Sequence, residues 1–187
     1  MMGLPLLSLI VAAPFVAALI LFVVPGAQRG LVRWISLLGA SVSLAGSVQV
    51  ARVYDLGQGG LQLPERYPLV PSLGIELNMA VDGWGVSLLL LTGIITFAGV
   101  LASWTLKERG KEVFIFLLVL VAGVFGVFVA QDLFVFFLFY EIAVLPMYLL
   151  IGIWGSSHAV TEAGPFRFVW KLLDIGGRQY AAMKLTL

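Results

Sequence analysis

The chain has 187 residues, of which 61% are hydrophobic and 11% are charged, and its net charge is +1. Soluble domains carry about 25% charged residues, so this composition excludes a soluble globular domain and indicates an integral membrane protein. The basic residues are few and scattered, which argues against a nucleic-acid partner. The absence of cysteine excludes disulfides and thiolate metal sites, and the single histidine, His158, cannot form a histidine metal site.

Five long apolar runs dominate the chain. They cover roughly residues 4–24, 34–50, 84–104, 113–130 and 133–154. A membrane-spanning helix needs about 20 apolar residues, and the runs lack the alternating pattern of barrel strands. The sequence therefore predicts an all-α membrane protein, a polytopic bundle of five complete transmembrane helices. No cleavage site follows the first run, so we interpret it as a membrane helix and not as a signal peptide.

Two connections have recognisable features. The stretch 51–82 is the longest polar segment between the helices, and its glycines and prolines predict turns. Residues 75–81 alternate in polarity, which favours a strand and hence a small hairpin on the outer membrane face. Gln131 and Asp132 leave room only for a tight turn between the fourth and fifth helices.

Basic residues predict the orientation in the membrane. The connections after the first, third and fifth runs carry nine Lys and Arg residues, whereas the opposite side has only Arg52 and Arg66. Cytoplasmic loops are rich in Lys and Arg. We therefore expect a multi-pass protein of the bacterial inner membrane with its N-terminus outside.

The last part of the chain carries two further predictions. Residues 155–179 form a cytoplasmic loop, in which the aromatic and basic residues of 166–173 suggest an amphipathic element at the membrane surface. Residues 180–187 resemble the start of a sixth transmembrane helix, although a short interfacial helix is an alternative. We interpret residues 1–187 as a single membrane domain at the N-terminal end of a longer polytopic protein.

Glu141 is the most informative residue of the sequence. It lies in the fifth run, about 4 Å from its middle at the helical rise of 1.5 Å per residue. A charge at that depth costs at least about 2.5–3.5 kcal/mol on insertion scales. Ionisable residues in such places usually belong to proton or ion pathways. We therefore assign Glu141 to proton transfer; the alternative is that it only holds helices together as a hydrogen-bonding group.

Pro146 follows Glu141 by five residues within the same helix. It has no N–H to donate to the carbonyl of Ile142, and its ring crowds that carbonyl. The sequence therefore predicts a kink or bulge just after Glu141. The freed carbonyl would offer water a hydrogen-bonding site, so we expect Pro146 to shape the proton path.

Other polar and small residues have simpler interpretations. Asp82 and Asp132 precede helices and are predicted to cap them, although Asp132 could also mark the mouth of a proton path. Glycines within the runs are predicted to let helices approach closely. They are Gly93, Gly99, Gly123 and Gly126.

The segment 136–155, FFLFYEIAVLPMYLLIGIWG, resembles the fifth helix of the chain M family of proton-translocating NADH–quinone oxidoreductase, or respiratory complex I. The stretch from residue 74 towards the third helix, LGIELNMAVDGWGVSLLLLTG, resembles that family's outer segment. Residues 176–187, GGRQYAAMKLTL, resemble the entry to its sixth helix. The resemblance covers most of the chain in order.

The resemblance implies an antiporter-like subunit of the membrane arm, which takes part in redox-driven proton translocation through Glu141. It implies that the chain is a subunit of an enzyme, a translocase, but does no redox chemistry itself. The expected partners are the other membrane-arm subunits, the lipid bilayer and protons. No cofactor is expected in this chain, since NADH, FMN, iron–sulfur clusters and quinone belong to other subunits.

Two alternatives remain open at this stage. A subunit of a multisubunit cation/proton antiporter or of a membrane-bound hydrogenase would share the same bundle and glutamate. A non-transporting membrane scaffold would use Glu141 only between helices.

Overall fold

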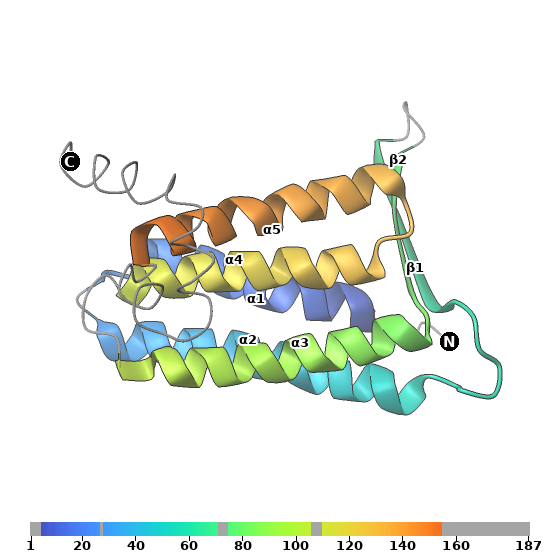
Figure 1. Cartoon of the computed structure of the whole chain (residues 1–187), viewed down its shortest axis with the longest axis horizontal. Coiled ribbons are helices and arrows are strands. Elements are labelled where there is room, and N and C mark those ends of the chain that lie inside the picture. The colour runs from blue at the N-terminus through green and yellow to red at the C-terminus, as the bar shows by residue number, and fades with distance from the viewer. Residues whose placement is uncertain (1–4, 27, 71–74, 106–109, 155–187) are drawn as a thin grey trace, which may run out of the picture. The chain divides into compact units, whose positions relative to one another are not determined.

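Five α-helices, one short 3-10 helix and one hairpin make up the described part of the chain. The structure is a computed structural model, and it describes residues 5–26, 28–70, 75–105 and 110–154. The elements in chain order are α1 (Leu6–Val23), α2 (Arg29–Val53), β1 (Gln62–Val70), β2 (Ile75–Val81), α3 (Gly83–Ala102), the short 3-10 helix η2 (Ser103–Thr105), α4 (Gly110–Val129) and α5 (Leu133–Trp154) (Figure 1).

The predicted membrane helices are confirmed in number and type. All five described helices are long and apolar enough to cross a membrane. The run predicted at residues 133–154 coincides with α5, whereas α2 begins at Arg29 and not near residue 34. The predicted run began later because Arg29 and Arg33 interrupt the apolar pattern at the start of the helix. Long basic side chains are nevertheless accommodated at the ends of membrane helices. The expected sixth helix and the loop 155–179 lie outside the described residues.

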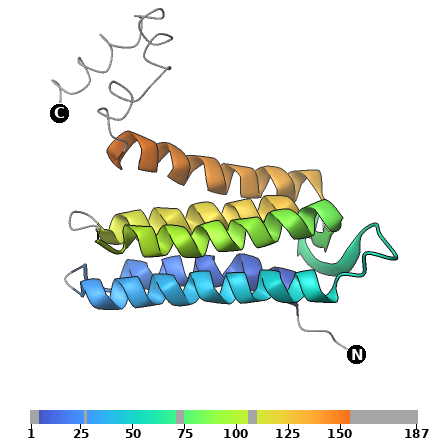
Figure 2. The same cartoon turned by 60° about the horizontal axis from the view of Figure 1, so that its bottom comes forward.

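Helices α1 to α4 pack around a common core. Each packs against the next, and α1 also packs against α4, which closes a ring of four helices (Figure 2). The core divides into two apolar clusters. One lies near the hairpin and includes Leu7, Leu89 and Phe125, and the other lies towards the opposite end and includes Leu21, Val100 and Leu118.

Small polar residues line the buried side of α2. Ser36, Ser43 and Ser47 are completely buried, and each hydroxyl donates to a backbone carbonyl. Ser43 reaches across to the carbonyl of Ile10 in α1, over 3.0 Å, while the other two bond within α2. Short side chains of this kind allow close helix packing in membranes. This face explains why α2 is the least apolar of the five spans, with a mean hydropathy of 1.5.

The predicted hairpin is present, and β2 has the expected bounds Ile75–Val81. It pairs antiparallel with β1, with Arg66 opposite Asn78 and Tyr67 opposite Leu77. The register is irregular between Gln62 and Glu65 and between Pro68 and Val70, where proline cannot donate to the ladder. The hairpin lies across the end of the bundle at which α1 and α3 begin (Figure 1).

The glycine predictions are correct for three positions and wrong for one. Gly123 and Gly126 lie against α5, and Gly93 lies against Leu44 of α2. Gly99 has no neighbouring atom within 4 Å of the place where a side chain would begin. It therefore packs against nothing among the described residues, because it lies on the outward side of α3.

Candidate functional site

Glu141 lies on the exposed side of α5. The helix is continuous from Leu133 to Trp154, and Glu141 occupies its middle. Its side chain is exposed, and no described residue forms a hydrogen bond or an ion pair with it. A carboxylate therefore sits halfway along an apolar helix without a partner in the described part of the chain. In hydrocarbon such a group needs a polar partner or water.

The orientation of Glu141 follows from how α5 packs on α4. Phe139 lies against Gly126, and the backbone of Ala143 lies against Gly123, where an added methyl group would come within 2.7 Å of the Ala143 nitrogen. Val135 and Pro146, on the same side of α5, are buried. At 100° per residue, Glu141 lies about 200° from Phe139 and from Ala143. It must therefore point away from α4.

The surface around Glu141 is otherwise apolar. We call it the Glu141 face and define it as Phe137, Glu141, Leu145 and Tyr148, which follow one another at helical spacing. The three neighbours of Glu141 are 53%, 62% and 71% exposed, respectively. Only 11% of the most apolar window of α5 is buried, compared with 56% for α4. The described residues thus cover one side of α5 and leave the side with the carboxylate open.

Pro146 lies on a different side of the helix from Glu141. Five residues of helix separate their directions by about 140°, and Pro146 is buried whereas Glu141 is exposed. The helix remains α-helical through Pro146. The kink or bulge that we predicted after Glu141 therefore does not interrupt the helix. The carbonyl of Ile142 still lacks the N–H that a residue other than proline would supply.

The two aspartates cap helices as predicted. The carboxylate of Asp132 accepts from the N–H groups of Phe134 and Val135, over 2.8 and 3.2 Å, at the start of α5. Asp82 accepts from the N–H of Gly85 over 2.7 Å at the start of α3. Such caps satisfy N–H groups that the helix cannot pair. This geometry accounts for both residues without a role in proton transfer.

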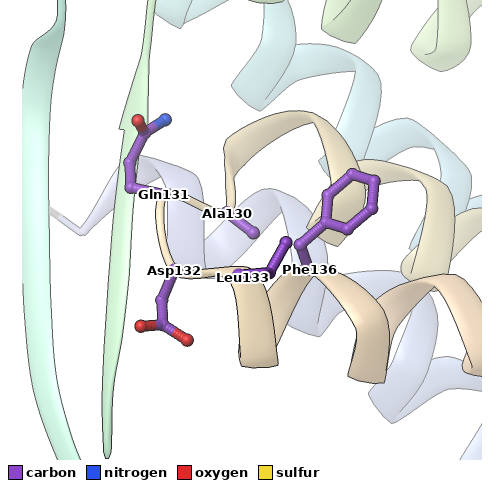
Figure 3. A pocket seen from close by; sticks show the side chains of 5 residues that line it. All are labelled: Ala130, Gln131, Asp132, Leu133 and Phe136. Carbon is purple, nitrogen blue, oxygen red and sulfur yellow. The ribbon is translucent and has the colours of Figure 1, made fainter.

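The turn before α5 is fixed by the hairpin. The N–H of Gln131 donates to the carbonyl of Asn78, and its side-chain amide donates to the carbonyl of Ala80. A shallow hollow of about 210 Å³ lies at this turn, and Figure 3 shows the Gln131 side chain reaching towards the strand while Asp132 points away. Ala130, Gln131, Asp132, Leu133 and Phe136 line it. Two hydrogen bonds thus place the start of the helix that bears Glu141.

Glu65 is a structural residue that the sequence analysis did not identify. Its carboxylate accepts from the N–H groups of Leu7 and Ser8, over 2.8 and 2.9 Å, and from the Ser8 hydroxyl. Pro5 supplies no side-chain cap to α1, and Glu65, which lies 58 positions after Leu7, does so instead. The separation hides this pairing from local sequence patterns.

A family model described as "NADH:quinone oxidoreductase/Mrp antiporter, TM" matches residues 130–176, which include Glu141 and Pro146. Chain 4 1 of NAD(P)H-quinone oxidoreductase from Synechococcus sp. (strain JA-2-3B'a(2-13)) is 40% identical over 184 residues, which is 98% of this chain and 31% of that relative. Chain 4 2 of NAD(P)H-quinone oxidoreductase from Thermosynechococcus vestitus is 35% identical over 184 residues, which is again 98% of this chain and 31% of that relative.

The chain is therefore similar to chain 4 of NAD(P)H-quinone oxidoreductase over 98% of its residues, and its residues 130–176 match the NADH:quinone oxidoreductase/Mrp antiporter family. The resemblance inferred from the sequence is thereby confirmed. The chain spans about 31% of the length of the two curated relatives named above.

The fold has a counterpart among solved structures. A chain of the membrane-bound sulfane sulfur reductase, an archaeal respiratory membrane complex, superposes with a TM-score of 0.66 at 20% identity. The match covers 82% of this chain and 24% of the other. At that identity the similarity concerns the fold alone, and it agrees with a multi-pass helical membrane protein.

Proposed function

We propose that this chain acts in the membrane arm of a proton-translocating NADH–quinone oxidoreductase, with Glu141 as the group that carries a proton within the membrane. The observation that carries the proposal is the similarity to NAD(P)H-quinone oxidoreductase chain 4 over 98% of this chain. The carboxylate in the middle of α5, which has no partner among the described residues, supports it, because an uncompensated charge at that depth is costly unless it serves ion or proton transfer.

The chain would act as one subunit of a larger enzyme. NADH, FMN, iron–sulfur clusters and quinone would be bound by other subunits, and this chain would contribute no redox step. Its partners would be the other membrane-arm subunits, the lipid bilayer and protons. The N-terminus would lie outside a bacterial inner membrane, since Arg29, Arg33 and Lys111 lie at the end of the bundle assigned to the cytoplasm.

Pro146 would act through the backbone. The carbonyl of Ile142, which receives no N–H from Pro146, lies one residue after Glu141 and can accept a hydrogen bond from water. A water held there would be within one helical turn of the carboxylate. We keep Pro146 as a residue that shapes the proton path, without contact with the Glu141 side chain.

A second function deserves a test because the family description also names the Mrp antiporter. In that case the chain would belong to a cation/proton exchanger without a redox partner. The names of the similar curated proteins favour the quinone oxidoreductase. A membrane-bound hydrogenase and a non-transporting scaffold remain as alternatives without an observation in their favour.

The experiment uses membranes from cells that lack the gene and from cells in which the complete gene is restored. NAD(P)H-driven quinone reduction, the accompanying proton movement, and sodium-dependent proton exchange are measured in both. We expect restoration of the gene to recover the NAD(P)H-driven activities. Recovery of sodium-dependent exchange alone would contradict the proposal and favour the antiporter.

A further inference from the structure

Two arginines gather with two tryptophans at the end of the bundle opposite the hairpin. At this end α1 stops, α2 begins, α3 stops and α4 begins (Figure 1). Arg29 and Arg33 lie one turn apart on α2, and therefore on the same face of that helix. Trp34 follows on α2, and Trp104 lies in η2 at the end of α3.

The aromatic residues hold Arg33 in place. Its guanidinium carbon lies 5.8 Å from the centre of the Trp104 ring, which is a cation–π distance. Trp34 meets Trp104 edge to face, with ring centroids 5.8 Å apart. Trp34 is nevertheless 59% exposed. The arginine is thus oriented by its neighbours while one side of the cluster stays open.

The positive charge of the two arginines is not neutralised within the described chain. No described carboxylate forms an ion pair with either guanidinium, and Glu112 is the one described carboxylate at this end of the bundle. Lys111 is differently engaged, because its amine donates to the carbonyl of Phe22 at the end of α1, over 3.2 Å. Arg29 and Arg33 therefore have no anionic partner among the described residues.

The surface beside the arginines is apolar and runs along α2. Trp34, Leu38 and Val42 follow one another at intervals of four residues and are exposed. Tryptophan prefers the headgroup level of a bilayer, and guanidinium groups bind phosphate oxygens in a bidentate manner. A ligand that matches this surface has a phosphate at one end and a hydrocarbon chain at the other.

We propose that Arg29 and Arg33 bind the phosphate of an anionic phospholipid, whose acyl chain lies along Trp34, Leu38 and Val42. Basic sites between membrane helices bind anionic headgroups in other proteins. Trp104 would position Arg33 for the phosphate. The two arginines lie in the first turns of α2, at the end away from the hairpin, and the proposal does not depend on the role of Glu141.

The test is native mass spectrometry of the complete subunit in detergent, titrated with phosphatidylglycerol or with phosphatidylcholine. The double variant Arg29→Gln and Arg33→Gln is compared with Arg52→Gln, which removes an exposed arginine from the other end of the same helix. We expect the unchanged subunit to retain phosphatidylglycerol at least several-fold better than phosphatidylcholine. The double variant should lose this preference, and Arg52→Gln should keep it.

Arg29→Gln alone provides a variant that keeps Arg33 and both rings of the aromatic cluster, and the substituted residue is exposed. We expect it to weaken phosphatidylglycerol binding partially. Equal binding of the two lipids by the unchanged subunit would overturn the proposal. So would full retention of phosphatidylglycerol by the double variant.

Discussion

Phe139 of α5 lies so close to Gly126 of α4 that a methyl group on the glycine would overlap the phenylalanine ring. Three residues earlier, Gly123 allows the backbone of Ala143 to approach in the same way. These two contacts fix the rotation of α5 about its axis. Because Glu141 lies between Phe139 and Ala143 in sequence, that rotation directs its carboxylate to the open side of the helix.

Gly126→Ala is expected to destabilise the protein. The added methyl group would force Phe139 away, and overpacking of this kind costs about 1–3 kcal/mol. Thermal unfolding of the purified subunit in detergent measures the effect. Gly99→Ala is the matched control, since nothing lies within 4 Å of that position, and alanine favours a helix by about 1 kcal/mol over glycine. Equal stability of the two variants would contradict the assigned contact.

Glu65→Ala is expected to loosen the hairpin from the start of α1. The substitution removes an acceptor shared by two backbone N–H groups and the Ser8 hydroxyl. A hydrogen bond to a charged group contributes about 1.5–3 kcal/mol to stability. Each bond to Glu65 should contribute less than this, because the site is only partly buried and solvent weakens the interaction. Hydrogen exchange of Leu7 and Ser8 should accelerate, while Glu76→Ala, at an exposed position of β2, should leave it unchanged.

Two substitutions of Asp132 distinguish a role in helix capping from a role in proton transfer. Asp132→Ala removes the cap of α5 and should cost about 0.5–2 kcal/mol. Asp132→Asn keeps a side-chain oxygen that can cap but cannot ionise, so stability and proton movement should both stay near the original values. If Asp132→Asn stopped proton movement while stability was preserved, Asp132 would belong to the proton path.

Ser43→Ala tests the polar contact between α1 and α2. It removes the hydrogen bond to the carbonyl of Ile10, and interhelical bonds in membranes contribute about 0.6 kcal/mol on average. The variant should therefore unfold at a slightly lower temperature in detergent. Ser41→Ala is the control, because the Ser41 hydroxyl donates to the carbonyl of Leu37 in its own helix. A larger decrease of the unfolding temperature in Ser41→Ala than in Ser43→Ala would contradict a contribution of the interhelical bond to stability.

The sequence predicted those features that depend on local patterns. The five helices follow from apolar runs, strand β2 from its alternation, and the caps at Asp82 and Asp132 from their place before helices. The contact of Glu65 with Ser8 was not predictable, because it joins residues 57 positions apart. Gly99 looked like the other helix glycines, since periodicity alone does not show which side of α3 meets a neighbour.

The candidate site was predictable in identity but not in orientation. Glu141 stood out because a carboxylate in an apolar run is costly. Its neighbours along α5 are apolar on all sides, so no pattern of residues indicated which side would face α4. The close contacts of Gly123 and Gly126 with α5 determine which side of that helix faces α4. Pro146 lies on this buried side.

The central claim is that Glu141 carries a proton, and the number of protons moved per quinone reduced tests it most directly. Glu141→Gln is introduced into the complete subunit, with Glu76→Gln as the control at an exposed carboxylate of the hairpin. The glutamine should not disturb folding of the described helices, because Glu141 bonds to none of their residues. We expect the number to fall in Glu141→Gln and to stay unchanged in Glu76→Gln. An unchanged number in an assembled Glu141→Gln complex would contradict the account.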